Sequence, residues 1–254
     1  MTKLKKLTII DSGMTKVPSA DKLPPNVETL DLHNGKIISM EEAGYDKFES
    51  LKELNLSYNQ FSSFHEAVSE IPNLQNLNLM MNFIGSVPKN AFDNMKNLQT
   101  LMIGSLMPLQ NADNGEQVVD ERYPDTKAAI EKAKEITAAN GGMVMAETYQ
   151  AQFHGNSYAM LASLDSDKGI ITSSFGTNTE AFKVLGNGVT SVTVKPTAIL
   201  PDTVITYNGK DYKSGEEIKI DGLVDGTNEI TLTAHNDFKN FVNVPTSVTY
   251  KIKL

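Results

Sequence analysis

A short pattern that recurs through the first half of the chain constrains the fold more than any other feature. Five segments read Leu-x-x-Leu-x-Leu, with Val or Ile at some of these positions, and their first residues lie 23 or 24 residues apart. One such unit cannot bury its own apolar edge, so units of equal length stack and share a continuous core. The pattern therefore predicts a solenoid of short parallel strands. The five segments are residues 4–9, 27–32, 51–56, 74–79 and 98–103.

Length, charge and cysteine content narrow the classes of function. The chain of 254 residues is long enough for two or three domains. Its net charge is −8 and Arg122 is its only arginine, which disfavours a nucleic-acid face or a phosphate clamp. Without cysteine there is no disulfide and no thiolate metal site. No apolar run is long enough to span a bilayer, so we expect no membrane insertion of this chain.

The ninth position of the repeat is expected to satisfy buried backbone groups. Repeats three and four carry Asn59 and Asn82 there, and an asparagine at such a bend bonds to backbone groups of adjacent turns. Repeats one and two carry Ser12 and Gly35 at the same position. We interpret the asparagines as structural and not as ligand-binding groups.

Over about residues 1–109, the five in-register units resemble the leucine-rich repeat family. Residues 87–98 match the convex side of its 24-residue repeat type, with Phe92 and Met95 filling the core from behind. The resemblance implies an α/β solenoid with a parallel β-sheet. Repeat five, with Leu106 and Pro108, is expected to close the array. No cap sequence precedes Leu4, so we expect either a chain cut from a longer protein, which we favour, or a first strand covered by another molecule.

Residues 110–160 are predicted to form a helix-containing cap and linker. Pro124 and Asp125 open a helix that runs to about Ala139, with Asp125 capping the first turn and residues 140–142 ending it. Its narrow, alanine-rich apolar stripe favours close packing against the last repeat. Residues 143–146 are suited to an added strand in the same place.

From residue 161 to 254 the apolar period changes to two, which predicts short strands. Asn208-Gly209 is a strong signal for a tight turn. Short strands separated by such turns indicate an all-β antiparallel sandwich. Four sequence motifs resemble those of the cadherin-like, immunoglobulin-like modules of bacterial surface proteins. They are residues 192–198 (VTVKPTA), 214–218 (SGEEI), 223–230 (LVDGTNEI) and 250–252 (YKI). Residues 236–246 form a loop that is longer than the glycine turn usual before the last strand of such modules. This loop is either a local insertion or an adhesive tip.

The sequence carries no pattern typical of catalysis. Asp165, Asp167 and Gly169 look like part of a calcium loop, but a third ligand and a closing glutamate are missing, so a solvated turn is favoured. Asp221 and Asp225 are more simply turn formers. There is no nucleophile elbow, phosphate loop or dinucleotide fingerprint. We expect no enzyme, no cofactor and no metal. The histidines, which lack metal spacing, are His33, His65, His154 and His235.

The concave columns of the repeats supply the candidate binding surface. Positions five, seven and eight point outward, and among them Tyr58, Met80, Met81 and Met102 form a patch in the later repeats. Exposed aromatic and methionine side chains give a large, adaptable contact area. The alternative, that the following segment folds back over this patch, fits equally well. The predicted partner-binding residues are Asp31, His33, Asn55, Tyr58, Asn78, Met80, Met81 and Met102, of which Tyr58, Met80 and Met102 are expected to matter most.

The order of repeats followed by an immunoglobulin-like domain is similar to that of the internalins, which hold a host protein on the concave face. The resemblance implies a non-enzymatic interaction or adhesion module of a bacterial cell-surface protein, outside the cell, with the sandwich as spacer and a host or bacterial surface protein as partner. The alternative is a structural stalk or scaffold whose ligand site lies outside this chain. Carbohydrate binding by the sandwich is a third option, and the lack of tryptophan counts against it.

Overall fold

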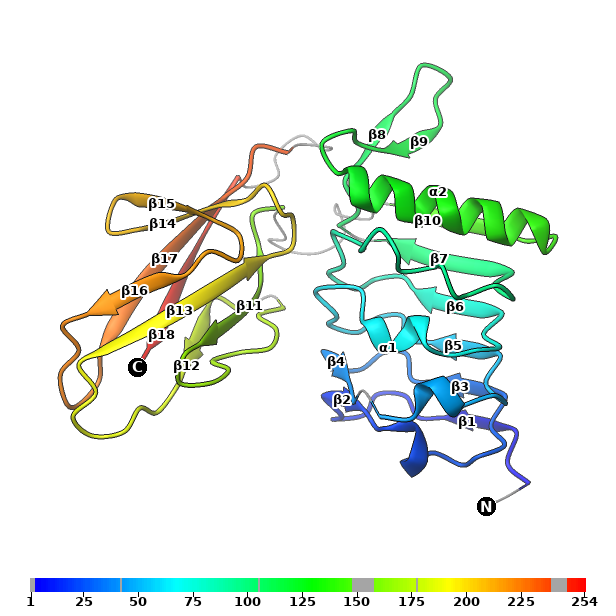
Figure 1. The fold of residues 1–254 in the computed structure, drawn as a ribbon, viewed down its shortest axis with the longest axis horizontal. Coiled ribbons are helices and arrows are strands. Elements are labelled where there is room, and N and C mark those ends of the chain that lie inside the picture. Colours follow the sequence, from blue (N-terminus) through cyan, green and yellow to red (C-terminus); the bar gives the residue numbers. More distant parts are fainter. Residues whose placement is uncertain (1–2, 42, 105, 148–157, 177, 239–245) are drawn as a thin grey trace. The chain divides into compact units, whose positions relative to one another are not determined.

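A computed structural model of the chain describes residues 3–41, 43–104, 106–147, 158–176, 178–238 and 246–254 (Figure 1). The chain divides into two compact units, Met1–Tyr149 and Gln150–Leu254. Each unit has its own sheets and is described by itself.

The first unit is built on a six-stranded parallel sheet with the order β1-β3-β5-β6-β7-β10 (Figure 1). The fourth residues of the repeats face one another across it: Leu7 pairs with Leu30, Leu30 with Leu54, Leu54 with Leu77 and Leu77 with Leu101. This register confirms the predicted solenoid of parallel strands. The strands are β1 (Lys6–Thr8), β3 (Thr29–Asp31), β5 (Glu53–Asn55), β6 (Asn76–Leu79), β7 (Thr100–Gly104) and β10 (Met143–Glu147).

The two asparagines at position nine bond to backbone groups as predicted. The Asn59 amide donates to the carbonyls of Leu32 at 2.8 Å and Leu56 at 3.1 Å, and its Oδ1 accepts the Ile37 N–H at 3.1 Å. Asn82 repeats this arrangement one turn later, with the Phe61 N–H on its Oδ1 at 3.0 Å. A Cβ added at Gly35, which stands where the pattern expects asparagine, would lie 2.8 Å from the Asn59 Oδ1.

Short elements and apolar side chains fill the convex side. The elements are the parallel pair β2 (Lys16–Val17) and β4 (Ser39–Met40), the 3-10 turns Ala20–Lys22 and Tyr45–Lys47, and helix α1 (Glu66–Ser69). Phe92 and Met95 are both fully buried, as predicted, and the Phe92 ring meets Phe64 edge-on with centroids 5.2 Å apart. The convex packing therefore closes the core behind the sheet.

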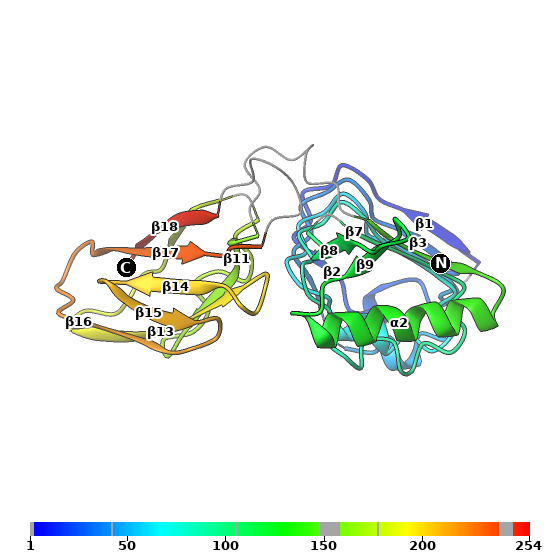
Figure 2. The same cartoon turned by 90° about the horizontal axis from the view of Figure 1, so that it is seen from above.

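The hairpin of β8 (Leu109–Asn111) and β9 (Gln117–Val119) and helix α2 (Pro124–Ala139) cap the last repeat. The Val87 N–H donates to the Thr126 hydroxyl at 3.0 Å, and the Asn140 amide donates to the carbonyls of Lys96 and Leu98, so both ends of α2 are tied to the repeats. Figure 2 shows α2 on the side of the unit away from β1 and β3.

The predicted helix and added strand are confirmed, but the predicted cap is wrong. Tyr123 occupies the N-cap position without a side-chain cap bond, and Asp125 lies inside the first turn. The reason is Pro124, whose fixed φ suits the first helical position, so the helix starts there and its N-cap lies two residues before Asp125.

The second unit contains two sheets that share one apolar core. The three-stranded sheet has the order β11-β13-β16 and the five-stranded sheet the order β12-β18-β17-β14-β15. Leu164, Val194, Ile205, Leu232 and Tyr250 from both sheets meet in the core. The strands are β11 (Leu161–Ser166), β12 (Glu180–Phe182), β13 (Ser191–Ala198), β14 (Val204–Tyr207), β15 (Lys210–Lys213), β16 (Ile218–Asp221), β17 (Glu229–His235) and β18 (Ser247–Lys253).

One strand pair corrects the prediction that this unit is antiparallel throughout. β12 runs parallel to β18, with Ala181 opposite Ile252. The chain leaves β11 in one sheet and crosses to the edge of the other, where β18 runs in the same direction.

The predicted turns of the second unit form. Asn208 and Gly209 both have positive φ, 48° and 75°, between β14 and β15, as a tight hairpin turn requires. The Asp167 carboxylate accepts the Thr193 N–H at 2.9 Å, which lowers its pKa, and the Gly169 N–H donates to the Ser166 carbonyl. The segment resembling a calcium loop is thus an exposed turn. Of the longer loop at 236–246, residues 239–245 lie outside the described residues.

Candidate functional site

The concave face of the first unit is formed by positions three and five of the repeats. Their side chains border a shallow hollow of about 210 Å³. The chemistry of the lining side chains changes from the first repeat to the last: charged residues come first, then asparagines, and then the methionine Met102. The concave side chains that line the hollow are Lys6, Thr29, Asp31, Glu53, Asn55, Asn76, Asn78, Thr100 and Met102.

Position five has an internal role in three successive repeats. The Asp31 carboxylate accepts the His33 N–H at 3.3 Å, and the Asn55 Oδ1 accepts the Ser57 N–H at 3.1 Å. The Asn78 Oδ1 accepts the Met80 N–H at 3.1 Å in the same way. Each side chain therefore caps a turn two residues later, the geometry that Asp and Asn favour.

This turn contradicts the prediction that Met80 is exposed on the concave face. Met80 is only 7% exposed and belongs to the core. Strand alternation would direct position seven outward, but β6 ends at Leu79 and the turn capped by Asn78 carries Met80 inward. Ser57, at the same position in repeat three, is buried as well.

Position eight forms a column with a left-handed backbone, exposed in repeats one to three and half-buried in repeat four. Repeats one and two place Asp11 and Asn34 there, with φ of 50° and 57°. Repeats three and four place Tyr58 and Met81 there, with φ of 55° and 61°, and Tyr58 is 53% exposed. Asp and Asn tolerate this conformation, whereas it costs larger side chains about 1–2 kcal/mol. We refer to Asp11, Asn34, Tyr58 and Met81 as the rim column.

The sequence-based set omitted two groups of concave residues: position three of the repeats, and two residues of β10. In β10, Met143 lies opposite Thr100 and Met145 opposite Met102, so both extend the concave face, and Met143 is 59% exposed. Their alternation in a segment suited to a strand was the available signal. The alternative that the following segment covers the patch is tested only as far as residue 147: β10 lies beside β7 in the sheet, and residues 148–157 lie outside the described residues.

Charged and titratable side chains on and beside this face contact one another within the chain. His33 Nδ1 lies 2.7 Å from Asp31 Oδ1, and Glu28 lies between Lys5 at 2.6 Å and Lys52 at 3.0 Å, which lowers the pKa of Glu28. In the part of the chain that the structure describes, no three His, Asp or Glu side chains gather in a way that could hold a metal ion. His154 lies outside that part. No helix among the described residues is both long and apolar enough to cross a membrane.

A stack of parallel strands whose turns are tied by asparagine side chains is typical of leucine-rich repeat solenoids. The model of the leucine rich repeat family matches residues 25–82, which supports a leucine-rich repeat protein. Repeats one and five lie outside this match but share the register of the sheet. Leucine-rich repeat domains commonly bind other proteins. No match was found among curated proteins.

Proposed function

We propose that the chain is a non-enzymatic binding module whose first unit holds a protein partner on the concave face and the rim column. The open hollow between β1 and β7 and the neighbouring Met102, Met143 and Met145 support a large contact area with adaptable side chains.

The observation that carries the proposal is the chemistry of the rim column. Tyr58 and Met81 occupy left-handed positions that repeats one and two fill with Asp11 and Asn34. A strained backbone under an exposed aromatic side chain has no benefit for folding, whereas an exposed tyrosine is the kind of residue that anchors a protein partner.

The wider setting that we propose is the surface of a bacterial cell, outside the cytoplasm, with a host or bacterial surface protein as partner. The second unit would serve as an immunoglobulin-like, cadherin-like spacer. Support comes from the motifs of residues 192–198 and 223–230, and from the two sheets that share one core.

The experiment is a capture of surface proteins by the intact chain and by the double variant Tyr58→Asn/Met81→Asn. Asparagine suits the left-handed conformation, so the variant removes the exposed apolar groups while its fold is kept. The matched control is Ile170→Asn, which removes a 62% exposed apolar side chain from the second unit.

The proposal expects a partner that binds the parent and the Ile170 variant alike, with affinity for the double variant lower by about tenfold or more. Equal affinity of all three chains would place the site elsewhere. Failure of the parent to capture any protein would favour the scaffold alternative.

A further inference from the structure

The last strand of the first unit's sheet, β10, is paired along one edge only. It lies beside β7, and the Met143 N–H donates to the Gln99 carbonyl at 2.9 Å. Alternate residues of a parallel strand direct their main-chain groups to opposite edges. Met143 and Met145 therefore bond toward β7, while the N–H and C=O groups of Val144 and Ala146 face the other edge. Among the described residues, no segment bonds to that edge.

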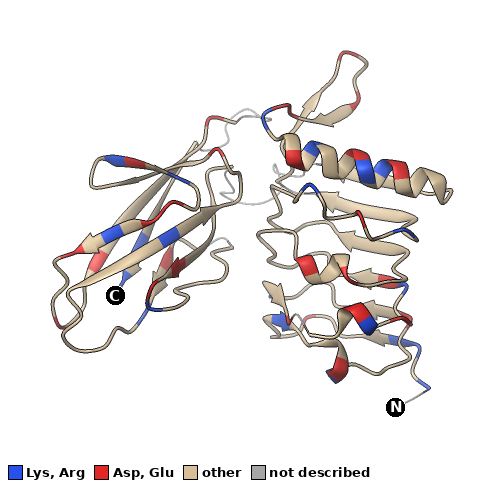
Figure 3. Cartoon of the chain, in the orientation of Figure 1, with Lys and Arg blue, Asp and Glu red and all other residues tan. Residues whose placement is uncertain are grey.

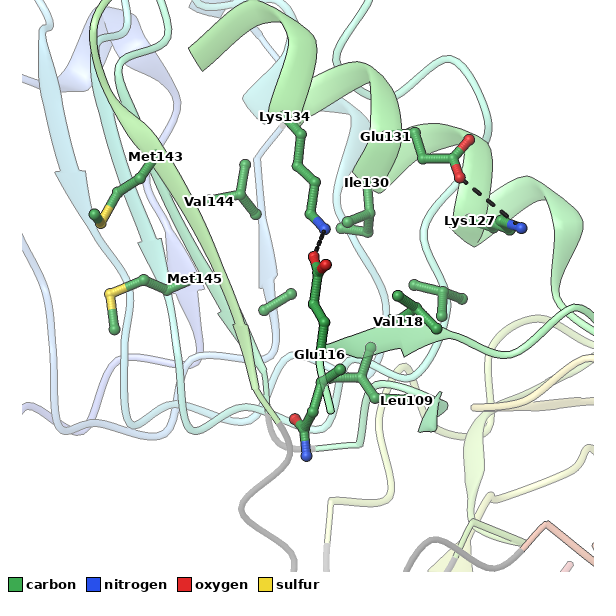
Figure 4. Close-up of a pocket in the computed structure, with 13 residues that line it drawn as sticks. Leu109, Glu116, Val118, Lys127, Ile130, Glu131, Lys134, Met143, Val144 and Met145 are labelled. Carbon is green, nitrogen blue, oxygen red and sulfur yellow. Dashed lines mark hydrogen bonds and ion pairs between the residues drawn. The ribbon is translucent and has the colours of Figure 1, made fainter. Parts of the chain in front are cut away.

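A pocket of about 850 Å³ opens beside this edge (Figure 4). Figure 4 shows it between β10, helix α2 and the β8–β9 hairpin. Its apolar lining includes Leu109, Val118, Ile130 and Val144. The volume is in the range of sites that enclose a ligand.

The charges at the pocket wall already have partners within the chain. Lys134 from α2 meets Glu116 from the hairpin at 3.1 Å, and Lys127 contacts Glu121 and also Glu131. Figure 3 shows basic and acidic residues interspersed along α2 in the same way. The wall therefore offers no unpaired charge to a charged ligand.

The geometry points to a peptide-binding site: an extended, uncharged and mainly apolar segment of a partner protein adds to β10 as a seventh strand. Only an extended main chain can pair with the outward groups of both Val144 and Ala146. One set of its alternate side chains enters the apolar pocket, and the other lies beside Met143 and Met145. A segment of about five residues, roughly 17 Å long, covers β10.

The strand on the other edge of β10 shows which alternation fits. In β7, Leu101 and Ile103 lie opposite Val144 and Ala146, whereas Thr100 and Met102 lie opposite Met143 and Met145. A strand that pairs with the outer edge of β10 and has the same order of side chains as β7 would place its residues beside the same side chains of β10. The probe is therefore a synthetic peptide that copies residues 98–104, with blocked ends, a fluorescein label and two added lysines for solubility.

The test measures fluorescence anisotropy of this peptide with the intact chain and with two variants. Ala146→Pro removes an outward N–H and leaves the bonds to β7 in place, because proline is tolerated on an edge strand whose N–H faces solvent. The matched control Ala146→Ser keeps the N–H. We expect the peptide to bind the parent and the serine variant, and the proline variant to bind about tenfold more weakly.

Amide hydrogen exchange by NMR gives a readout at single residues. In the free chain, we expect the amides of Val144 and Ala146 to exchange fast and that of Met145 to be protected. Saturating peptide slows exchange at Val144 and Ala146 by about tenfold or more. A peptide that is N-methylated at the amides that face β10 should bind the parent chain no more tightly than the unmodified peptide binds the proline variant.

Three results would overturn the site: no binding up to about 1 mM peptide, equal binding by the proline variant, or no new protection at Val144 and Ala146. Self-association of the parent that the proline variant abolishes, seen by sedimentation, would show a second copy as the occupant and would also overturn it. The Tyr58→Asn/Met81→Asn variant retains peptide binding, so this site and the rim column succeed or fail independently.

Discussion

Replacing Gly35 by alanine is expected to destabilise the repeat unit, although alanine at a flexible glycine usually stabilises. The new Cβ would lie 2.8 Å from the Asn59 Oδ1, which holds the buried Ile37 N–H at 3.1 Å. Relief of the overlap moves the Asn59 amide and breaks this bond. An unpaired buried N–H costs about 1–3 kcal/mol, and the lower entropy of the unfolded chain returns about 0.4–1 kcal/mol. The net expectation is a loss of about 1–2 kcal/mol of unfolding free energy.

A double-mutant cycle with Asn59→Ala tests this explanation. Asn59→Ala by itself leaves the Ile37 N–H and the Leu32 carbonyl without their partner, and should cost about 2–4 kcal/mol. In that background the Gly35 substitution meets no Oδ1, so it should stabilise by about 0.4–1 kcal/mol. The coupling between the two sites is then about 2 kcal/mol.

Urea unfolding of the intact chain, followed by far-ultraviolet circular dichroism, gives the four free energies. The repeat-unit transition is the one that Asn59→Ala shifts. Additive effects of the two substitutions, or a parent chain stabilised by Gly35→Ala, would refute the expectation that the Asn59 side chain excludes a side chain at position 35.

Three further substitutions test other parts of the structure. Gly142→Ala would place a Cβ 1.8 Å from the Gln99 carbonyl oxygen, so β10 must shift from β7, and urea unfolding should show a loss of about 1–3 kcal/mol or more; an unchanged midpoint would contradict it. The buried Tyr250 hydroxyl accepts the Leu161 N–H at 2.8 Å, and burial raises the pKa of Tyr250 to about 12. Because this pKa lies above its unfolded value of about 10, the parent should be stable below pH ~10 and lose about 2–3 kcal/mol as the pH rises to ~12. Tyr250→Phe should cost about 1–3 kcal/mol at neutral pH and lack this alkaline loss, and denaturation at both pH values decides whether the two curves differ. Tyr58→Asn should raise the unfolding free energy by about 0.5–1 kcal/mol, since asparagine accepts the left-handed turn; a decrease would argue against strain at the rim column.

The repeat period was sufficient to predict the sheet because it fixes which positions are buried in every unit. Leu30, Leu54 and Leu77 face one another as that period requires. The roles of Asn59 and Asn82 were predictable for a related reason, since the bend of each repeat leaves a buried backbone donor that needs a partner.

The positions that the sequence did not reveal depend on contacts between neighbours. Met80 is buried because the Asn78 side chain caps a turn just after β6, and strand alternation alone does not include this bond. At Gly35 an added Cβ would lie 2.8 Å from the Asn59 Oδ1 of the next repeat, a contact that the repeat pattern alone does not include. The parallel pairing of β12 with β18 follows from a crossing between sheets, which short-range periodicity cannot register.

The change of character along the concave face follows from the same turn chemistry. Asp31, Asn55 and Asn78 are needed at position five because each caps the N–H of position seven. Repeat five has the small, buried Gly104 at position seven, and a methionine stands at position five. Because β7 continues through Gly104, position five has no turn to cap in this repeat, and Met102 lies opposite Met145 on the concave face. The apolar part of the concave face and the pocket at the edge of β10 thus share one strand. A partner that paired its main chain with that edge would bring its next side chains onto these methionines, so the end of the solenoid near β10 is where the two proposed surfaces can act on one ligand.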